Sequence, residues 1–447
     1  MFKSFTKMSL SAQIFTGLAA GILFGFILSL SAQISPGVDN VISNYVVTGF
    51  DIIKRLFINA LKMVVVPLVL VSLICGTCSL SDPKKLGSLG GKSILLYLLT
   101  TAIAITLALT LANIFDPGAG VTMETTDYVI KNAPALTEVL GNLVTDNPFK
   151  AMASGNMLQV IIFAIIFGIA ISRAGESGKK IAGFFDALND VILKLVTIIM
   201  HIAPYGVFCI MAVVIFDTGL EAISKLFVYF VLVAITLVIH ASLTYPTLLT
   251  LFTGLNPLML IKKMRPALLF AFTTSSSAAT LPVTMEVARK RLGVGKTTSS
   301  FSLPLGATIN MDGTAIMQGV ATVFIAQLYG VDLSLAQYLT VILMATLASI
   351  GTAGVPSVGL VMLTMVLNQV NLPSEAIGML LGIDRFLDMM RTAVNITGDA
   401  TIACIVSKSE QDFDEDMFND PKAGLDFEGQ DFDKEQLEQK VNDNQAT

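Results

Sequence analysis

The sequence is poor in the side chains that build metal centres and nucleophilic active sites. Its 447 residues include two histidines and four cysteines. His201 and His240 form no metal-ligand pattern, so we expect each to be a buried or interfacial side chain. Cys75 and Cys78 form a C-x-x-C pair inside an apolar segment, which favours a packed pair over a redox site. No Ser-His-Asp arrangement or phosphate-binding loop is apparent. The sequence therefore predicts neither an enzyme nor an organic cofactor, and no nucleic-acid partner.

Charged residues are also scarce. They make up 14% of the chain, whereas hydrophobic residues make up 54%. Apolar runs of roughly 20 residues, long enough to cross a bilayer, occur near 10–31, 45–76, 91–115, 156–173, 192–216, 225–252, 300–329 and 376–407. No small-residue cleavage site follows the first run, so we expect it to remain as a helix. This composition excludes a soluble core and predicts an all-α polytopic membrane protein.

Basic residues recur in alternate loops, which indicates the orientation. They lie at Lys3 and Lys7, Lys84 and Lys85, Arg173 to Lys180, Lys262 to Arg265, and Arg289 to Arg291, whereas the loop 116–150 is acidic or neutral. By the positive-inside rule we expect both termini in the cytoplasm. In a Gram-negative source the protein would lie in the inner membrane.

The final segment, 408–447, has a different composition. It holds 13 acidic and four basic residues. A polar segment of this charge predicts a solvated, disordered cytoplasmic tail. The alternative is that its phenylalanines, Phe413, Phe418, Phe427 and Phe432, dock on a partner.

The apolar segment 376–407 carries an unusual set of charges. On a helix, Asp384, Asp388, Arg391, Asn395 and Asp399 fall within an arc of about 80°. Each charge would cost roughly 3 kcal/mol at the centre of a membrane helix. A chain keeps such a stripe when the charges face protein, ions or substrate. The segment therefore reads as the binding helix of a transporter.

Two other apolar stretches have polar, helix-breaking centres. Segment 267–288 contains Thr273 to Ser277 and then Pro282, and segment 343–367 contains Ser349 to Pro356. Each half is too short to cross a bilayer but long enough to enter and return. Broken backbone at membrane depth is tolerated only against protein or a water-filled cavity, and paired broken segments indicate a transport site. We expect two re-entrant hairpins entering from opposite sides. Two kinked spanning helices are an equal alternative.

A third signal is the polar run 306–314 inside an apolar span. Asn310, Asp312, Gly313 and Thr314 are poor helix-interior residues. We expect a locally unwound helix whose carbonyl oxygens, beside one carboxylate, suit a hard cation such as sodium. The alternative is a kink in which Asp312 pairs with an arginine.

Together these motifs resemble a known family. NMDGTA (310–315), SSSAATLP (275–282), SIGTAGVP (349–356) and D-x₃-D-x₂-RT-x₂-N-x₃-D (384–399) look like the glutamate/neutral amino acid transporter family. The similarity covers about 10–410. Its members are sodium- or proton-coupled carriers of acidic amino acids, neutral amino acids or dicarboxylates. The similarity is closest to prokaryotic sodium-coupled carriers of aspartate and glutamate.

The resemblance implies eight transmembrane helices plus two re-entrant hairpins, built as inverted repeats in a homotrimeric, elevator-type transporter. Scaffold helices 1–2 would occupy 1–80, transport-domain helix 3 would occupy 88–116, and scaffold helices 4–5 would occupy 117–220. The rest of the transport domain would occupy 225–407, with hairpins at 258–292 and 335–370, before the tail 408–447. Membrane lipids would surround it.

The resemblance also implies the site. Asp388 would take the substrate ammonium and Arg391 its side-chain carboxylate. The full substrate set is Ser275, Ser276, Ser277, Met311, Thr314, Gly354, Val355, Pro356, Gly359, Asp388, Arg391, Thr392 and Asn395. Sodium would bind at three sites: Gly306, Asn310, Asn395 and Asp399; Thr308, Ser349, Ile350 and Thr352; and Tyr97, Thr100, Thr101, Asn310 and Asp312. Where many prokaryotic members carry an arginine before the hairpin serines, this chain has Ser275, and Arg385 is a candidate replacement.

The third set favours sodium over proton coupling, because Tyr97, Thr100 and Thr101 share one helical face. The pair Asp388 and Arg391 favours aspartate or glutamate, since only a substrate with both groups satisfies both charges. The sequence does not distinguish those two substrates. Alternatives are a proton-coupled carrier, a neutral amino acid or dicarboxylate carrier, and an anion channel or receptor-like protein.

Overall fold

A computed structural model describes residues 10–80, 86–120, 144–218, 221–350, 354, 356 and 358–424. Over these residues the chain is helical and has no strand longer than an isolated bridge. The α-helices are α2 (Leu10–Ala32), α3 (Pro36–Val41), α4 (Thr48–Leu80), α5 (Gly91–Phe115), α7 (Pro148–Ser154), α8 (Met157–Arg173), α9 (Gly175–Met200), α10 (Ala203–Thr218), α11 (Glu221–Ile239), α12 (Tyr245–Thr253), α13 (Pro257–Thr274), α14 (Ser277–Lys290), α15 (Lys296–Ile309), α16 (Asp312–Leu328), α17 (Leu335–Ser349), α18 (Val358–Gln369), α19 (Ile377–Ser409) and α20 (Glu415–Asn419). Three π-helical turns, η1 (Ile42–Val47), η2 (Leu86–Gly90) and η3 (His240–Thr244), and one 3₁₀ turn, η4 (Ser374–Ala376), complete them.

Several helices have the length and composition of membrane spans. Among the described residues, four qualify: Ala12–Ala32, Pro36–Cys78, Ser88–Phe115 and Ser224–Thr253. The pair α9 and α10, bent by 48°, forms a fifth if it is counted as one span. Helix α19 has 33 residues but is not among them, because its charged and polar side chains lower its hydropathy. The all-helical fold with several apolar helices therefore fits a polytopic membrane protein.

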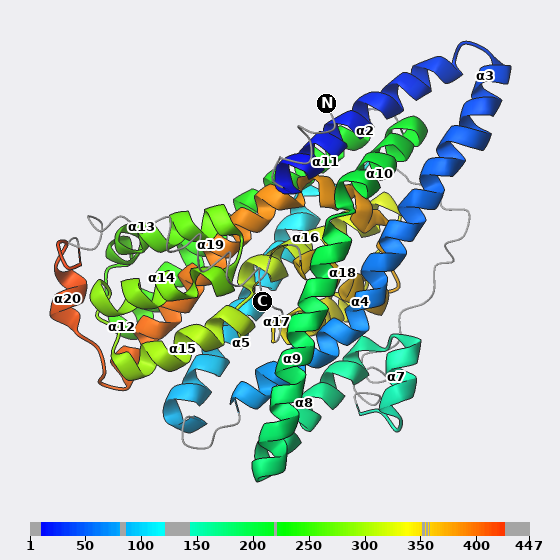
Figure 1. Ribbon diagram of the computed structural model, residues 1–447. Helices are drawn as coiled ribbons and strands as arrows, with labels where there is room; N and C mark the ends of the chain where they lie inside the picture. Colours follow the sequence, from blue (N-terminus) through cyan, green and yellow to red (C-terminus); the bar gives the residue numbers. More distant parts are fainter. Residues whose placement is uncertain are drawn as a thin grey trace.

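The helices form two groups (Figure 1). In the first, α2 packs on α10, and α4 packs on α8, α9 and α10. In the second, α5 and α11 to α19 pack around one another, with α19 in contact with α5, α11, α13, α15 and α16. The groups meet where α10 contacts α19 and α18 contacts α4. Helix α19 thus lies at the centre of the second group.

Both broken segments contain a helix interruption. Helix α13 ends at Thr274, and the next residue, Ser275, has a left-handed φ of 52°. The Ser276 side chain caps α14 by accepting from the Ala279 N–H at 3.1 Å. Because α13 and α14 then pack on each other, the segment is a helical hairpin. In the second segment α17 ends at Ser349 and α18 begins at Val358. The two interruptions touch, since Ser276 Oγ donates to the Gly354 carbonyl at 2.6 Å.

The unwinding predicted within 306–314 is confirmed. Helix α15 ends at Ile309 and α16 begins at Asp312, with Asn310 and Met311 non-helical between them. Asp312 therefore occupies the first turn of α16, where a helix favours a negative charge.

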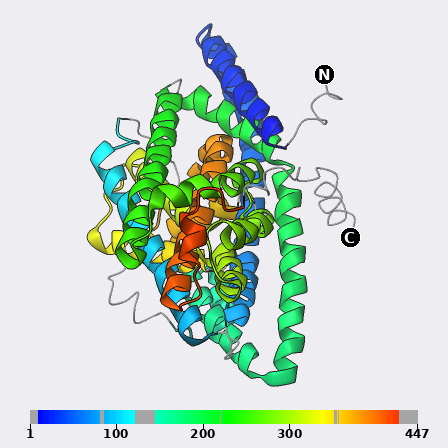
Figure 2. The same ribbon diagram turned by 90° about the vertical axis from the view of Figure 1, so that its left-hand side faces the viewer.

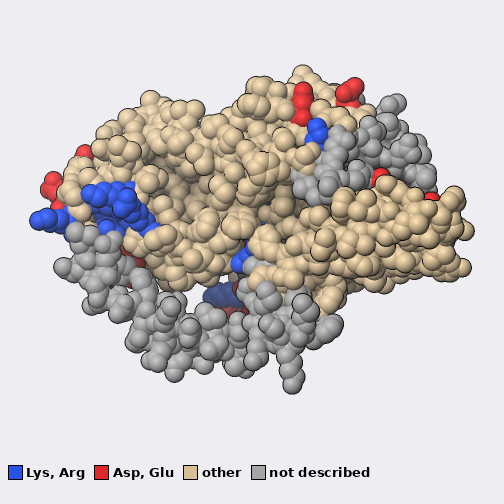
Figure 3. Space-filling model, turned by 90° about the horizontal axis from the view of Figure 1, so that it is seen from above, with Lys and Arg blue, Asp and Glu red and all other residues tan. Residues whose placement is uncertain are grey.

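Charged side chains are unevenly spread over the surface. In Figure 3, Lys and Arg gather at the end of the molecule that carries α13 and α20 in Figure 1, and most of the remaining face is uncharged. Large apolar side chains are exposed on the outer helices, such as Leu23, Leu56 and Val191 at 61%, 66% and 64%. Such a surface suits lipid rather than water.

The prediction of a disordered tail from residue 408 is wrong for its first part. Residues 408 and 409 belong to α19, and the chain then forms a turn and helix α20. Phe418 is fully buried and Phe413 packs beside it, whereas Phe427 and Phe432 lie outside the described residues. Hydrogen bonds from Lys92 and Ser88 lower the pKa of the Glu410 carboxyl below its usual value.

Candidate substrate and cation site

A small cavity lies where α14, α16, α18 and α19 converge. Its volume is about 20 Å³, and its lining consists of Ser275, Ser277, Met311, Thr314, Gly354, Gly359, Asp388, Arg391, Thr392 and Asn395. The structure thus brings together ten of the residues expected to bind substrate, although their binding role stays a prediction. Ser276 joins the set through Gly354, while Val355 lies outside the described residues. A cavity of this size holds no amino acid, so the site is closed in this conformation. A larger open groove of about 750 Å³ lies elsewhere, beside Asp412 and Arg289.

Arg391 is the charged centre of this cavity. It is 1% exposed, and it donates through Nη1 to Asp384 Oδ1 at 2.7 Å and through Nη2 to Asp388 Oδ1 at 2.8 Å. Arg385 Nη1 lies 3.7 Å from Asp388 Oδ2. A buried guanidinium needs such partners because removing a charge from water is costly. An anion that binds Arg391 must therefore replace or share carboxylate contacts that already exist.

Neutral groups complete the cavity. Asn395 accepts the Gly313 N–H at 2.8 Å through Oδ1, and its Nδ2 lies 3.3 Å from the Met311 sulfur. Thr392 donates to the Asp388 carbonyl at 2.8 Å. These contacts fix the start of α16 against the middle of α19.

The first predicted sodium set converges. Asn310 Nδ2 donates to the Asn395 carbonyl and to Asp399 Oδ1, each at 2.9 Å, and the Asn310 N–H donates to the Gly306 carbonyl at 2.8 Å. Asn310 and Asp399 are almost completely buried. The set gathers carbonyl, amide and carboxylate oxygens, the ligand types that hard cations take.

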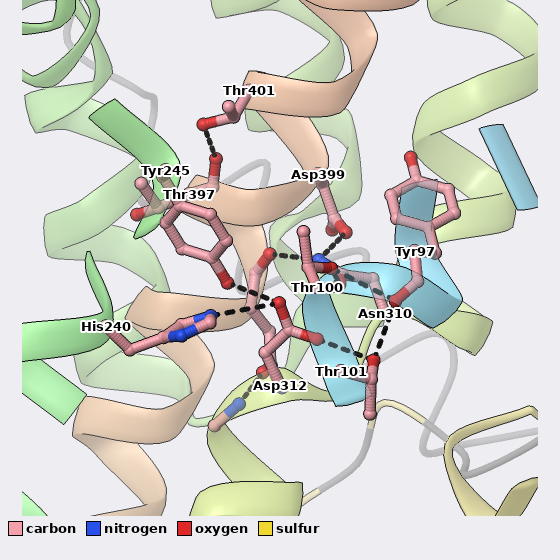
Figure 4. A network of polar contacts seen from close by, with 12 residues as sticks. Tyr97, Thr100, Thr101, His240, Tyr245, Asn310, Asp312, Thr397, Asp399 and Thr401 are labelled. Carbon is pink, nitrogen blue, oxygen red and sulfur yellow. Dashed lines mark hydrogen bonds and ion pairs between the residues drawn. The ribbon is translucent and has the colours of Figure 1, made fainter. Parts of the chain in front are cut away.

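The third set converges on Asp312 (Figure 4). Thr101 donates to Asp312 Oδ1 at 2.6 Å, and Thr100 Oγ1 lies 3.5 Å from Asn310 Oδ1. Both threonines also donate to the Tyr97 carbonyl, at 2.9 and 3.0 Å. The helical spacing of Tyr97, Thr100 and Thr101 therefore places oxygens of α5 beside the unwound part of α15–α16.

The second set is only partly brought together. Thr308 donates to the Leu305 carbonyl at 2.9 Å and Ser349 to the Thr346 carbonyl at 2.7 Å, so both hydroxyls bond within their own helices. Ile350 packs with the cluster that contains Leu305. Thr352 lies outside the described residues.

Sequence reasoning missed three residues of this network. Tyr245 donates to Asp312 Oδ2 at 2.9 Å, and His240 Nε2 lies 3.2 Å from the same atom. Ser302 accepts from the Tyr97 hydroxyl through its carbonyl at 3.0 Å. His240 is fully buried, as expected, but its contact with Asp312 was not foreseen. It begins the π-helical turn η3, a feature that is frequent at functional sites and has no clear sequence signal.

Gly306 offers a local test of the first oxygen cluster. A methyl group on Gly306 would overlap the Asp399 carboxylate and lie 2.7 Å from the Tyr97 hydroxyl. We expect Gly306→Ala to weaken sodium affinity by at least about tenfold, the effect of losing roughly 1.4 kcal/mol of ligand contacts. Sodium titration of purified protein by a fluorescence or calorimetric signal measures it. Gly183→Ala is the matched control, because nothing lies within 4 Å of a methyl group there. Equal sodium affinity in Gly306→Ala would contradict the cluster's role.

Known proteins are similar in sequence to this chain over most of its length. Residues 10–409 match the model of the sodium:dicarboxylate symporter family. The chain is 36% identical over 426 residues to the proton/sodium-glutamate symport protein of Bacillus caldotenax, covering 92% of this chain and 96% of that protein. It is 33% identical over 426 residues to the proton/glutamate-aspartate symporter of Escherichia coli (strain K12), covering 91% and 94%. It is 35% identical over 368 residues to the C4-dicarboxylate transport protein of Bacillus subtilis (strain 168), covering 80% and 87%.

A buried charged helix beside two interrupted helical segments and an unwound, oxygen-lined helix defines a membrane transporter, not an enzyme. The chain belongs to the sodium:dicarboxylate symporter family. The family resemblance drawn from the four sequence motifs is therefore confirmed.

Proposed function

We propose that the protein is a secondary active symporter that takes up L-aspartate or L-glutamate together with sodium. The observation that carries this proposal is the placement of Asp388 and Arg391 in one buried cavity. Asp388 would hold the substrate ammonium, and Arg391 would hold the side-chain carboxylate with its planar pair of donors.

The two charges restrict the substrate. A dicarboxylate has no ammonium and would be repelled by Asp388. A neutral amino acid would bring no side-chain carboxylate to replace or share the contacts that the buried Arg391 makes with Asp384 and Asp388. An acidic amino acid satisfies both groups. Glutamate and aspartate are also the substrates in the names of the Bacillus caldotenax and Escherichia coli relatives, which supports this choice.

Sodium is the proposed coupling ion. Asp312, Asp384, Asp388 and Asp399 exceed Arg385 and Arg391 by two negative charges. Three sodium ions and one acidic amino acid of net charge −1 would neutralise this excess. A loaded site without net charge crosses a low-dielectric barrier at a lower free-energy cost than a charged one. The two oxygen clusters around Asn310 would hold two of these ions. Asn395 would serve both substrate and ion, which links the two bindings.

Proton coupling is the second candidate. The Bacillus caldotenax relative is named for both ions and the Escherichia coli relative for the proton. The contact of His240 with Asp312 places a second ionisable group in the third cluster, which favours this candidate.

The architecture that goes with this function is also a proposal. Eight spans, with α13–α14 and α17–α18 as re-entrant hairpins, would separate a scaffold of the first group from a moving transport domain of the second. Alternating access would then follow an elevator movement in a homotrimer. We place both termini in the cytoplasm of a cell membrane, the inner one in a Gram-negative source.

Labelled L-aspartate uptake into proteoliposomes tests the proposal. An inward sodium gradient is compared with equal choline at constant pH. We expect accumulation only with sodium, competed by L-glutamate but not by serine or succinate. Accumulation driven by a pH gradient without sodium would instead support the proton candidate. Competition by succinate or serine would refute the proposed pairing of Asp388 and Arg391 with substrate.

A further inference from the structure

The segment that follows α19 is bound across the ends of α13, α14 and α15 (Figure 2). We call residues 410–420 the clasp. Its backbone pairs with the loop after α14: the Gly295 N–H donates to the Asp412 carbonyl and the Asp414 N–H to the Gly293 carbonyl, each at 2.8 Å. Gly293 has a φ of +72°, and a methyl group there would overlap the Asp414 carbonyl. The loop thus approaches the clasp too closely for any residue with a side chain.

Side chains of the clasp enter the hairpin itself. Phe418 is fully buried in a cluster with apolar residues of α13 and α14, including Met264 and Val287. Lys263 of α13 is 1% exposed and donates to the Met417 carbonyl at 2.6 Å and to the Arg291 carbonyl at 2.7 Å. Its ammonium also lies 5.7 Å from the centre of the Phe418 ring. One buried cation therefore joins α13, the end of α14 and the clasp.

Other contacts tie the clasp to neighbouring helices. Asp412 Oδ2 accepts from the Thr298 hydroxyl at 3.2 Å in the first turn of α15. Glu410 pairs with Lys92 of α5 at 2.7 Å. Lys408, at the end of α19, donates to the Thr253 carbonyl of α12 at 2.8 Å and pairs with Glu415 at 2.9 Å. The α13–α14 hairpin is therefore linked through the clasp to the helices that surround the candidate site.

The α17–α18 hairpin is held differently. At the end of this hairpin away from its turn, Gln337 of α17 donates to the carbonyl of Val370, directly after α18, at 3.3 Å. This hydrogen bond joins the two halves of the hairpin to each other. Tyr338 donates to Asn113 of α5 at 2.5 Å. Phe418 packs as a buried aromatic side chain against α13 and α14. In the described residues, no later segment of the chain does the same for α17 and α18. The clasp is therefore a tie that the α13–α14 hairpin has and that the described part of the α17–α18 hairpin lacks.

We propose that the clasp is a positioning element for transport. It keeps the α13–α14 hairpin against α15 and α19, so that Ser276 and Ser277 stay beside the cavity during transport. This inference rests on the proposed function, because a carrier couples substrate to ions only if the site never opens to both sides. Loosening the clasp would let substrate leave without its ions.

Phe418→Ala and Gly293→Ala test the clasp. Phe418→Ala removes the buried ring of the clasp. Gly293→Ala disrupts the backbone hydrogen bonds between the clasp and the loop after α14. Two controls leave the clasp whole: a stop after Gly424, and Phe252→Ala on an exposed ring of α12 (54% exposed). All variants are purified, reconstituted at equal amounts of folded protein and loaded with labelled L-aspartate. Efflux without sodium and the plateau of sodium-driven accumulation are measured.

We expect both clasp variants to raise the rate of sodium-free efflux by about tenfold, which corresponds to about 1.4 kcal/mol. Both should also lower the plateau of sodium-driven L-aspartate accumulation. The controls should match the wild type. Hydrogen exchange should rise in α13 and α14 but not in α17, a readout that needs no substrate. Two results would overturn the proposed role of the clasp. One is unchanged hydrogen exchange in α13 and α14 of the clasp variants. The other is efflux from the clasp variants equal to that of the wild type, when the wild type accumulates substrate. A wild type that accumulates no substrate with sodium would instead refute the proposed function, while the exchange measurement still tests the clasp.

Discussion

Arg391→Gln is expected to lower kcat/KM for sodium-driven L-aspartate uptake by at least about 100-fold. The Arg391 guanidinium is 1% exposed and pairs with Asp384 and Asp388. In binding, truncating one partner of a buried hydrogen-bonded charge pair costs about 2–5 kcal/mol, and about 2.7 kcal/mol corresponds to 100-fold. The variant also loses the donor pair proposed for the substrate carboxylate. Initial uptake rates over a range of L-aspartate concentrations measure the effect.

Arg385→Gln is the matched control for this prediction. Its side chain is 20% exposed and its Nη1 lies 3.7 Å from Asp388, so its attraction to that carboxylate is weaker and screened by solvent. We expect the kcat/KM for L-aspartate uptake to fall by no more than about tenfold in Arg385→Gln. Sodium binding measured without substrate should persist in Arg391→Gln, because the ion pairs of Arg391 with Asp384 and Asp388 involve none of the predicted sodium ligands. A loss of L-aspartate uptake in Arg385→Gln as large as that in Arg391→Gln would contradict the central role of Arg391.

Asp312→Asn is expected to raise the sodium concentration that gives half-maximal uptake by about 100-fold, since a buried carboxylate and its cation attract each other strongly at low dielectric. Asparagine keeps the shape of the side chain but removes its charge. Thr101 and Tyr245 donate to the Asp312 oxygens at 2.6 and 2.9 Å, so the amide replaces one acceptor by a donor in a fully buried site. Uptake at a fixed L-aspartate concentration over a sodium series measures the effect.

Asp146→Asn provides the control, because Asp146 is an exposed loop carboxylate. It should leave the sodium dependence unchanged. The steepness of the sodium dependence should also fall in Asp312→Asn, as expected when one of several bound ions is lost. Unchanged sodium dependence in Asp312→Asn would refute a sodium site at this carboxylate and would favour a structural role for it.

Local rules were sufficient for the broad class and for the charged face. Hydropathy alone indicates a membrane protein, because burial in lipid demands long apolar helices. The spacing of Asp384, Asp388 and Arg391 places them on one face of any helix, and α19 is helical throughout. The unwinding at Asn310 also followed from local propensity, since four of the five residues from 310 to 314 disfavour the helix interior.

Long-range pairings were beyond such rules. His240 and Tyr245 meet Asp312 from 72 and 67 residues away, and the π-helical turn His240–Thr244 separates α11 from Tyr245. The clasp was predicted as disordered because its composition is acidic. Composition does not reveal that Gly293 and Gly295 leave room for its backbone, or that Lys263 and the apolar ends of α13 and α14 form a place for Phe418.

The sequence by itself thus determined the membrane class, the family and the helix that carries the charges, because each follows from periodicity or from motifs close in the chain. Only the tertiary structure decided which groups hold Arg391 and Asp312, and where the first part of the tail lies. The physical reason is that buried charges and hydrogen-bonding groups must find partners. Which partners they find depends on how helices distant in sequence pack, and that packing sets the geometry of the site.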